Sequence, residues 1–153
     1  MYTMVIMWAN YNRRRGLTIV ELLIVIVVIA ILASVVIVAY SGIQRRARDA
    51  QRVHDMSVLM KAMESYSTLN GSYPSVCPGG DGSGCPVQTL ASALVPSVIS
   101  VVPNDPKFPY SYYQYVRGSA TSYAVYSSDY ETKSPCKVGV NMNPGWWGAP
   151  ACT

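Results

Sequence analysis

A long apolar run near the N-terminus constrains this chain more than any other feature. It follows three arginines, Arg13–Arg15, and between Leu22 and Tyr40 it carries no formal charge, with Ser34 as its polar interruption. About 20 apolar residues in an α-helix span the ~30 Å hydrocarbon core of a bilayer. Backbone groups in lipid must satisfy their hydrogen bonds within the segment. The run therefore predicts a membrane-spanning helix.

Two ordinary interpretations compete for this run. A secretory signal peptide is usually shorter, and only Ala39-Tyr40-Ser41 weakly resembles its cleavage site. A plain single-span anchor fits the length. Neither interpretation explains Glu21, because a carboxylate within an apolar helix costs about 2.5–3.5 kcal/mol near the bilayer centre and less near its edge. Glu21 is therefore a candidate functional residue.

The residues around Glu21 resemble a known signal. The segment Gly16-Leu17-Thr18-Ile19-Val20-Glu21-Leu22 is similar to the class III signal of type IV pilins and type II secretion pseudopilins. That signal is a basic leader ending in Gly, then a hydrophobic residue, with Glu fifth after the cut. The resemblance implies that a membrane-bound prepilin peptidase cleaves after Gly16, that the amine of Leu17 is methylated, and that the apolar helix is retained.

The new N-terminus gives Glu21 a role in assembly. In a packed bundle of such helices, its carboxylate can pair with the Leu17 ammonium of a neighbouring subunit. Removing one partner of a buried pair costs about 3–5 kcal/mol, so we expect Glu21 to set the register between subunits. The resemblance further implies identical or related pilin subunits and an inner-membrane assembly platform as partners. Membrane lipid surrounds the helix before assembly.

The sequence divides into four segments. We assign a leader to 1–16, the membrane and assembly half of a long helix to 17–42, its amphipathic half to 43–70, and a globular head to 71–153. The amphipathic half is indicated by an apolar stripe that includes Val53, Met56 and Leu69 and ends at Asn70-Gly71. Ser41-Gly42 is its expected weak point. The expected fold class is α+β and pilin-like, a lollipop with a small antiparallel sheet.

The head is predicted from turn residues and alternation. We expect, in order, a loop at Ser72–Pro86, a short helix at Val87–Val95, a hairpin of Tyr110–Arg117 and Ser122–Ser128, and a strand at Lys137–Met142. The intervening Val-Pro-Asn-Asp-Pro turn resembles that of the major pseudopilin.

Charged residues cluster directly after the apolar run. Arg45, Arg46, Arg48 and Arg52 are interspersed with Asp49 and Asp55. The favoured interpretation is a solvated helix face with pairs such as Arg45–Asp49 and Arg52–Asp55. An electrostatic lining between filament subunits and a contact with lipid headgroups remain alternatives.

Four cysteines lie outside the apolar run, and in an exported protein they predict disulfides. Three connectivities are open; the nearest-neighbour one joins Cys77 to Cys85 and Cys136 to Cys152. The second of these pairs resembles the C-terminal disulfide loop of type IV pilins. Without a CxxC motif, zinc is disfavoured. Trp146 and Trp147 lie in this loop, and we expect one to anchor it and the other to be exposed.

No catalytic constellation is visible, and we expect neither an enzyme nor a cofactor or metal site. A single histidine excludes an HExxH site. Without Arg13–Arg15, nine basic residues face eight acidic ones, which does not support nucleic-acid binding.

The sequence thus predicts a structural subunit of a type IV pilus-like filament. Before assembly it would cross the inner membrane once, with a cytoplasmic N-terminus, and afterwards it would lie in a cell-surface filament. The alternatives are a pseudopilin of a type II secretion system and a monomeric membrane-anchored binding module.

Overall fold

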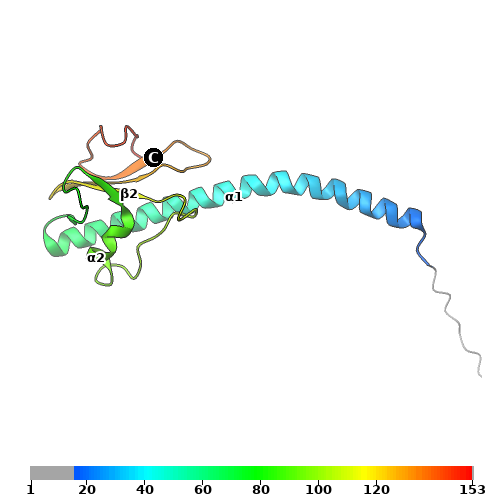
Figure 1. The fold of residues 1–153 in the computed structure, drawn as a ribbon, viewed down its shortest axis with the longest axis horizontal. Helices are drawn as coiled ribbons and strands as arrows, with labels where there is room; N and C mark the ends of the chain where they lie inside the picture. Colours follow the sequence, from blue (N-terminus) through cyan, green and yellow to red (C-terminus); the bar gives the residue numbers. More distant parts are fainter. Residues whose placement is uncertain (1–15, 153) are drawn as a thin grey trace, which may run out of the picture. The chain divides into compact units, whose positions relative to one another are not determined.

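The structure, a computed structural model, describes residues 16–152, which form two compact units on either side of the Tyr40–Ser41 bond. One helix, α1 (Ile19–Asn70), runs through both units and is drawn from blue to green in Figure 1. We call residues 41–152 the head. The predicted leader, apart from Gly16, lies outside the described residues.

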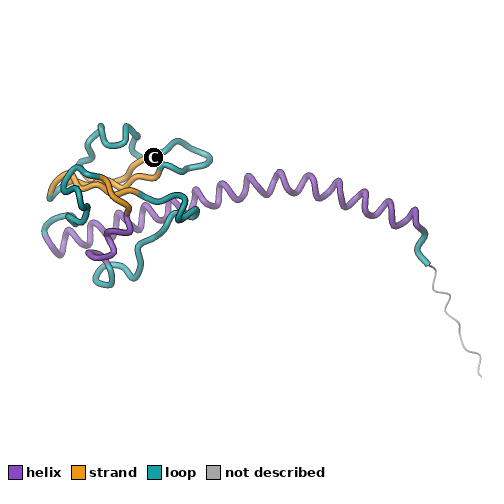
Figure 2. Tube along the Cα trace, in the orientation of Figure 1, coloured by secondary structure: helices purple, strands orange, loops and turns teal. Residues whose placement is uncertain are grey.

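The head contains a four-stranded antiparallel sheet with its strands in sequence order. The strands are drawn in orange in Figure 2. Its elements are β1 (Gly84–Pro86), the 3₁₀-helix η1 (Val87–Leu90), α2 (Ala91–Leu94), β2 (Gln114–Ser119), β3 (Ser122–Ser127) and β4 (Cys136–Val140). A long helix packed on a small antiparallel sheet confirms the predicted α+β, pilin-like fold class.

The strands lie close to their predicted places, with two differences. β2 begins at Gln114 rather than Tyr110, because the amides of Tyr110 and Ser111 donate to the Lys107 carbonyl in a turn just before it. The prediction that all of Ser72–Pro86 is loop is wrong at Gly84–Pro86, which pairs with β2. So short a strand carries no alternation for a sequence pattern to reveal.

The core lies between the head part of α1 and the sheet. Four apolar residues of α1 are buried in it: Met56, Leu59, Ala62 and Met63. They belong to one cluster with Leu90, Leu94 and the buried tyrosines of the sheet. Val53 and Leu69, predicted on the same stripe, are exposed. The core-facing stripe is therefore narrower than the pattern predicts, because the helix buries only one face.

The helix ends at its predicted stop. α1 terminates at Asn70, and Gly71 has a φ of +73°, a conformation that glycine adopts without steric cost. The Gly71 amide donates to the carbonyl of Ser67 at 2.8 Å. Ser41 and Gly42, the predicted weak point, are helical.

Candidate processing and assembly site

Thr18 and Glu21 organise the first turn of α1. The amide and Oγ1 of Thr18 both donate to Oε2 of Glu21, at 2.8 and 2.7 Å, and the Glu21 amide donates to Thr18 Oγ1 at 3.2 Å. This reciprocal arrangement is a capping box, which satisfies backbone donors that are otherwise unpaired at a helix start. Its Thr-x-x-Glu signature is legible in the sequence, so Thr18 is a site residue that a search for capping boxes would have found.

The candidate cleavage bond, Gly16–Leu17, immediately precedes this box. Leu17 is 76% exposed, and a Cβ placed on Gly16 would meet no atom within 4 Å, so the bond is sterically open. A cut there leaves the Thr18 amide in place, and the capping box survives it. Among the described residues, Glu21 uses only Oε2 as an acceptor. Its other oxygen is available to an ammonium group.

The apolar side chains that follow face outward on every side of α1. The large ones from Leu22 to Ile37 are all exposed. By length and composition, α1 is the one helix within residues 16–152 that is able to cross a membrane. Such a surface is stable in lipid or against other apolar helices, since water penalises its exposure.

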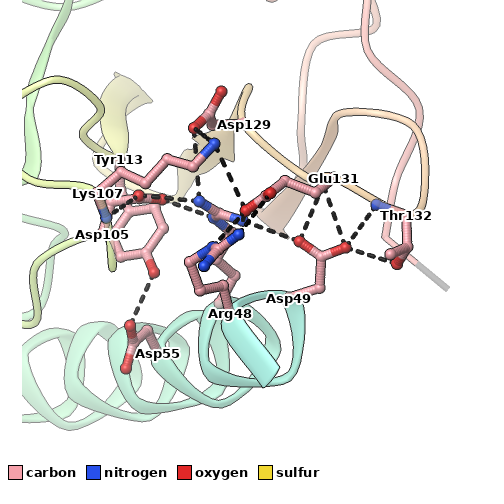
Figure 3. Close-up of polar contacts among 10 residues, drawn as sticks. Arg48, Asp49, Asp55, Asp105, Lys107, Tyr113, Asp129, Glu131 and Thr132 are labelled. Carbon is pink, nitrogen blue, oxygen red and sulfur yellow. Dashed lines mark hydrogen bonds and ion pairs between the residues drawn. The ribbon is translucent and has the colours of Figure 1, made fainter. Parts of the chain in front are cut away.

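A polar cluster joins α1 to two later segments of the head (Figure 3). At its centre Arg52, with a side-chain exposure of 0%, donates to both carboxylate oxygens of Asp105 at 2.8 and 3.1 Å. Its Nη1 donates to Asp49 at 2.8 Å. Arg48 binds Glu131 through two hydrogen bonds of 2.6 and 2.8 Å. The cluster fixes the head part of α1 relative to the chain around residues 105 and 131.

Two carboxylates of this cluster have strongly lowered pKa values. Burial alone would raise the pKa of Asp49, but hydrogen bonds from the Thr132 side chain, two backbone amides and Arg52 lower it to about 2. Hydrogen bonds from Arg48 lower the pKa of Glu131 to about 2. Both groups are therefore ionised at neutral pH, and both favour the folded head there.

The predicted solvated face is wrong for Asp49, Arg52 and Asp55, which are buried. Asp55 accepts a hydrogen bond from the Tyr113 hydroxyl at 2.7 Å, and burial raises its pKa. Instead of pairing with Asp55, Arg52 pairs with Asp49 and with the distant Asp105.

Two disulfides join Cys77 to Cys85 and Cys136 to Cys152, and the residues described contain no free cysteine. The loop closed by Cys136–Cys152 is arranged around Lys137. Its buried ammonium group donates to three backbone carbonyls of the loop, at 2.8–3.1 Å.

The two tryptophans of this loop both lie against the sheet. Trp147 stacks on Tyr126, with ring centroids 4.9 Å apart, and donates to Gln114 at 2.7 Å. Trp146 covers Gly118, where a Cβ would lie 2.5 Å from the indole ring. Both are half-buried, so the prediction of one exposed tryptophan is wrong.

Comparisons with known proteins agree with this geometry. Residues 11–37 match the family described as the prokaryotic N-terminal methylation motif. The chain is 34% identical over 68 residues to the type II secretion system core protein G of Escherichia coli, covering 44% of this chain and 47% of the relative. It is 33% identical over 82 residues to that of Klebsiella pneumoniae, covering 54% of each.

The same protein of Pectobacterium carotovorum is 36% identical over 67 residues, covering 44% of this chain and 43% of the relative. This chain thus spans about half the length of the curated relatives that it matches. No solved structure matches it significantly. The resemblance seen in the sequence is confirmed: the chain carries the N-terminal methylation motif of prepilin-type signals and is homologous to type II secretion system core protein G.

Proposed function

We propose that this chain is a structural subunit, not an enzyme, of a pilin-like filament built through the apolar half of α1. The observation that carries the proposal is the outward-facing apolar helix directly behind an open Gly16–Leu17 bond. The methylation motif covers both features. The subunit is anchored in the membrane before assembly, with its N-terminus cytoplasmic, and the related subunits of the filament then replace lipid around the helix.

Processing creates the contact on which assembly depends. Prepilin peptidase cuts after Gly16, and methylation follows at the amine of Leu17. The ammonium group of one subunit then pairs with the Glu21 oxygen of its neighbour that the capping box leaves available. An uncompensated charge at this position costs about 3–5 kcal/mol in an apolar bundle, so the pair selects one register. The inner-membrane assembly platform is the remaining partner.

The type II secretion pseudopilin is the form of this proposal that the comparisons favour. The curated relatives named above are all core protein G of such a system. The Cys136–Cys152 loop instead resembles the C-terminal loop of type IV pilins. A filament that spans the periplasm and one that reaches the cell surface use the same helix chemistry, and they differ in where the filament is found.

Variants of the capping box separate the two roles of Glu21. Glu21→Gln keeps an N3 acceptor for the box but removes the charge. Thr18→Val removes the two hydrogen bonds of the Thr18 hydroxyl, to Glu21 Oε2 and from the Glu21 amide, and keeps the charge. In chains that carry an introduced Ile29→Cys in the apolar helix, we expect Glu21→Gln to abolish crosslinks between neighbouring subunits in native membranes, and Thr18→Val to retain them. Glu21→Gln that assembles as well as wild type would show that Glu21 only caps the helix.

A monomeric membrane-anchored binding module is the rival from another class. It has no need of a neighbour, so neither variant would change its state. The discriminating control is crosslinking of the wild-type chain in native membranes. Crosslinks between identical positions of α1 that appear only in cells with an active prepilin peptidase support the filament, and their absence in wild type supports the rival.

A further inference from the structure

We infer that Arg45 and Arg46 bind the anionic headgroups of phospholipids at the end of the apolar run. This inference rests on the proposed function, because it concerns the membrane-inserted subunit. Beyond the proposed function, the inference specifies which class of lipid the subunit binds, in the leaflet that faces the head.

The first support is position along the helix. From Leu22 to Gln44 no side chain carries a formal charge. An α-helix of that length measures about 35 Å, slightly more than the ~30 Å hydrocarbon core. Arg45 and Arg46 are the next residues, so an inserted helix places them at the level of the lipid phosphates. Their long side chains are able to extend toward the interface while their methylene groups stay in apolar surroundings.

The second support is availability. Arg48 and Arg52 are both engaged by carboxylates of the head. Arg45 and Arg46 are exposed and make neither a hydrogen bond nor an ion pair within the described part of the chain. Asp49, one turn away, is occupied by Arg52, Thr132 and the Glu131 amide. The head therefore engages Arg48 and Arg52 in ion pairs. Arg45 and Arg46, the two arginines nearest the apolar run, are available to bind an external anion.

The third support is the shortage of carboxylates on a second copy of the head. Asp49, Asp105, Asp129 and Glu131 belong to the polar cluster, Asp55 binds Tyr113, and Asp81 binds Arg117. Among the acidic side chains of residues 41–152, only Glu64 makes neither a hydrogen bond nor an ion pair through its carboxylate. A neighbouring subunit therefore offers the arginine pair little complementary charge, whereas an anionic leaflet offers a continuous layer of phosphates.

The chemistry of the arginine pair fits phosphate esters. A guanidinium group presents parallel donors that match two phosphate oxygens. Consecutive residues of a helix project about 100° apart, so the two side chains reach different lipids around it. Attraction of one basic residue to an anionic membrane surface corresponds to about a fivefold change in binding. The pair is therefore expected to favour anionic over zwitterionic lipid by about 25-fold.

Native mass spectrometry of the full chain, with Arg13, Arg14 and Arg15 replaced by glutamine in every variant so that they add no basic charge, measures this preference directly. The chain is released from mixed micelles that contain phosphatidylglycerol and phosphatidylcholine, and the two bound lipids are counted. We expect Arg45→Gln/Arg46→Gln to lose the roughly 25-fold preference for phosphatidylglycerol. The charge-matched control Lys61→Gln/Lys133→Gln removes two exposed lysines of the head and should keep it. An unchanged preference in the arginine variant, or an equal loss in the control, would overturn the inference.

Crosslinking between copies in native membranes separates this inference from the proposed function. If the arginine variant keeps its lipid preference but loses those crosslinks, the pair contacts a neighbouring subunit and the lipid inference is wrong. If the wild-type chain shows the preference, the variant loses it, and neither chain crosslinks, the lipid site stands and the filament proposal fails. Loss of the preference with crosslinks retained supports both.

Discussion

Between Leu17 and Ile37 the large apolar side chains are 47–85% exposed, whereas Leu59, Leu90 and Leu94 of the head are 0% exposed. Both regions use the same residue types. The head encloses its apolar residues between a helix face and a sheet, whereas nothing in the described part of the chain covers the N-terminal part of α1. The enclosed core of the head is stable within one chain, but the exposed apolar surface of the N-terminal part of α1 needs lipid or other subunits around it.

The polar residues of the two regions follow the same division. In the head, Arg52 is surrounded by carboxylates of the same chain. At the start of α1, Thr18 is the one partner of the Glu21 carboxylate among residues 16–152, and the second carboxylate oxygen is not used there. The head therefore satisfies its buried charges with partners of the same chain, whereas the apolar half of α1 needs lipid or other subunits to cover its apolar surface and to pair with Glu21.

The largest expected effect comes from removing the centre of the head cluster. Arg52→Met leaves Asp49 and Asp105 buried without their cation, which should lower the free energy of unfolding by about 3–5 kcal/mol. Urea unfolding of the full chain in detergent micelles, followed by tryptophan fluorescence, measures it. The exposed Arg45→Met should change it by less than about 0.5 kcal/mol. Leu23→Ala, in the apolar half, should leave the unfolding of the head unchanged. A large effect of Leu23→Ala would break the comparison between the two regions.

Removal of a disulfide is expected to have the next largest effect on the free energy of unfolding. Cys136→Ser/Cys152→Ser opens the loop with a sequence separation of 16, and it should lower the free energy of unfolding by about 3 kcal/mol. Cys77→Ser/Cys85→Ser opens a loop with a separation of 8, so a somewhat smaller loss is expected. The same urea titration compares them. The opposite order would mean that native contacts, rather than loop length, dominate.

Acid should destabilise the head through Glu131 and Asp49. Their pKa values are about 2 in the fold, against 4.5 and 3.8 as ordinary values. Groups with a lowered pKa contribute stability above the ordinary value, and this contribution is lost as the pH falls toward 2. The raised pKa of Asp55 acts in the opposite direction and offsets part of the loss. Melting temperatures that stay constant from pH 5 to 2.5 would contradict this account of the cluster.

The smallest expected effects distinguish two buried tyrosines. Tyr115→Phe leaves the Pro74 carbonyl without its hydroxyl donor, now at 2.8 Å, and should cost about 1 kcal/mol. The hydroxyl of buried Tyr123 has no partner among the described residues. Tyr123→Phe should therefore be neutral or slightly stabilising. A loss in Tyr123→Phe equal to that in Tyr115→Phe, measured by urea titration, would reveal a partner for this hydroxyl.

Local patterns account for the parts of this fold that the sequence predicts. The end of α1 could be placed because Asn70-Gly71 stops a helix by its own conformational preference. The β2–β3 hairpin follows from alternation on both sides of a short turn. The capping box of Thr18 and Glu21 is equally local, but it was not predicted from the sequence, because Glu21 was interpreted only as an assembly residue.

Features that depend on distant partners could not be predicted. Arg52 and Asp105 are separated by 53 positions, and Arg48 and Glu131 by 83. In sequence Arg52 resembles one of several surface charges, because short-range spacing offers Asp55 as its partner. β1 also depends on a distant partner, since Gly84–Pro86 forms a strand by pairing with β2.

The central claim is that the apolar half of α1 is retained, processed and completed by other subunits. Intact mass and an N-terminal peptide map of the protein from native membranes test it most directly. The account predicts a chain that begins at methylated Leu17 and contains four oxidised cysteines. A chain that begins at or near Met1 would favour a plain anchor, and cleavage near Tyr40 would remove the apolar half of α1; either result would contradict the account.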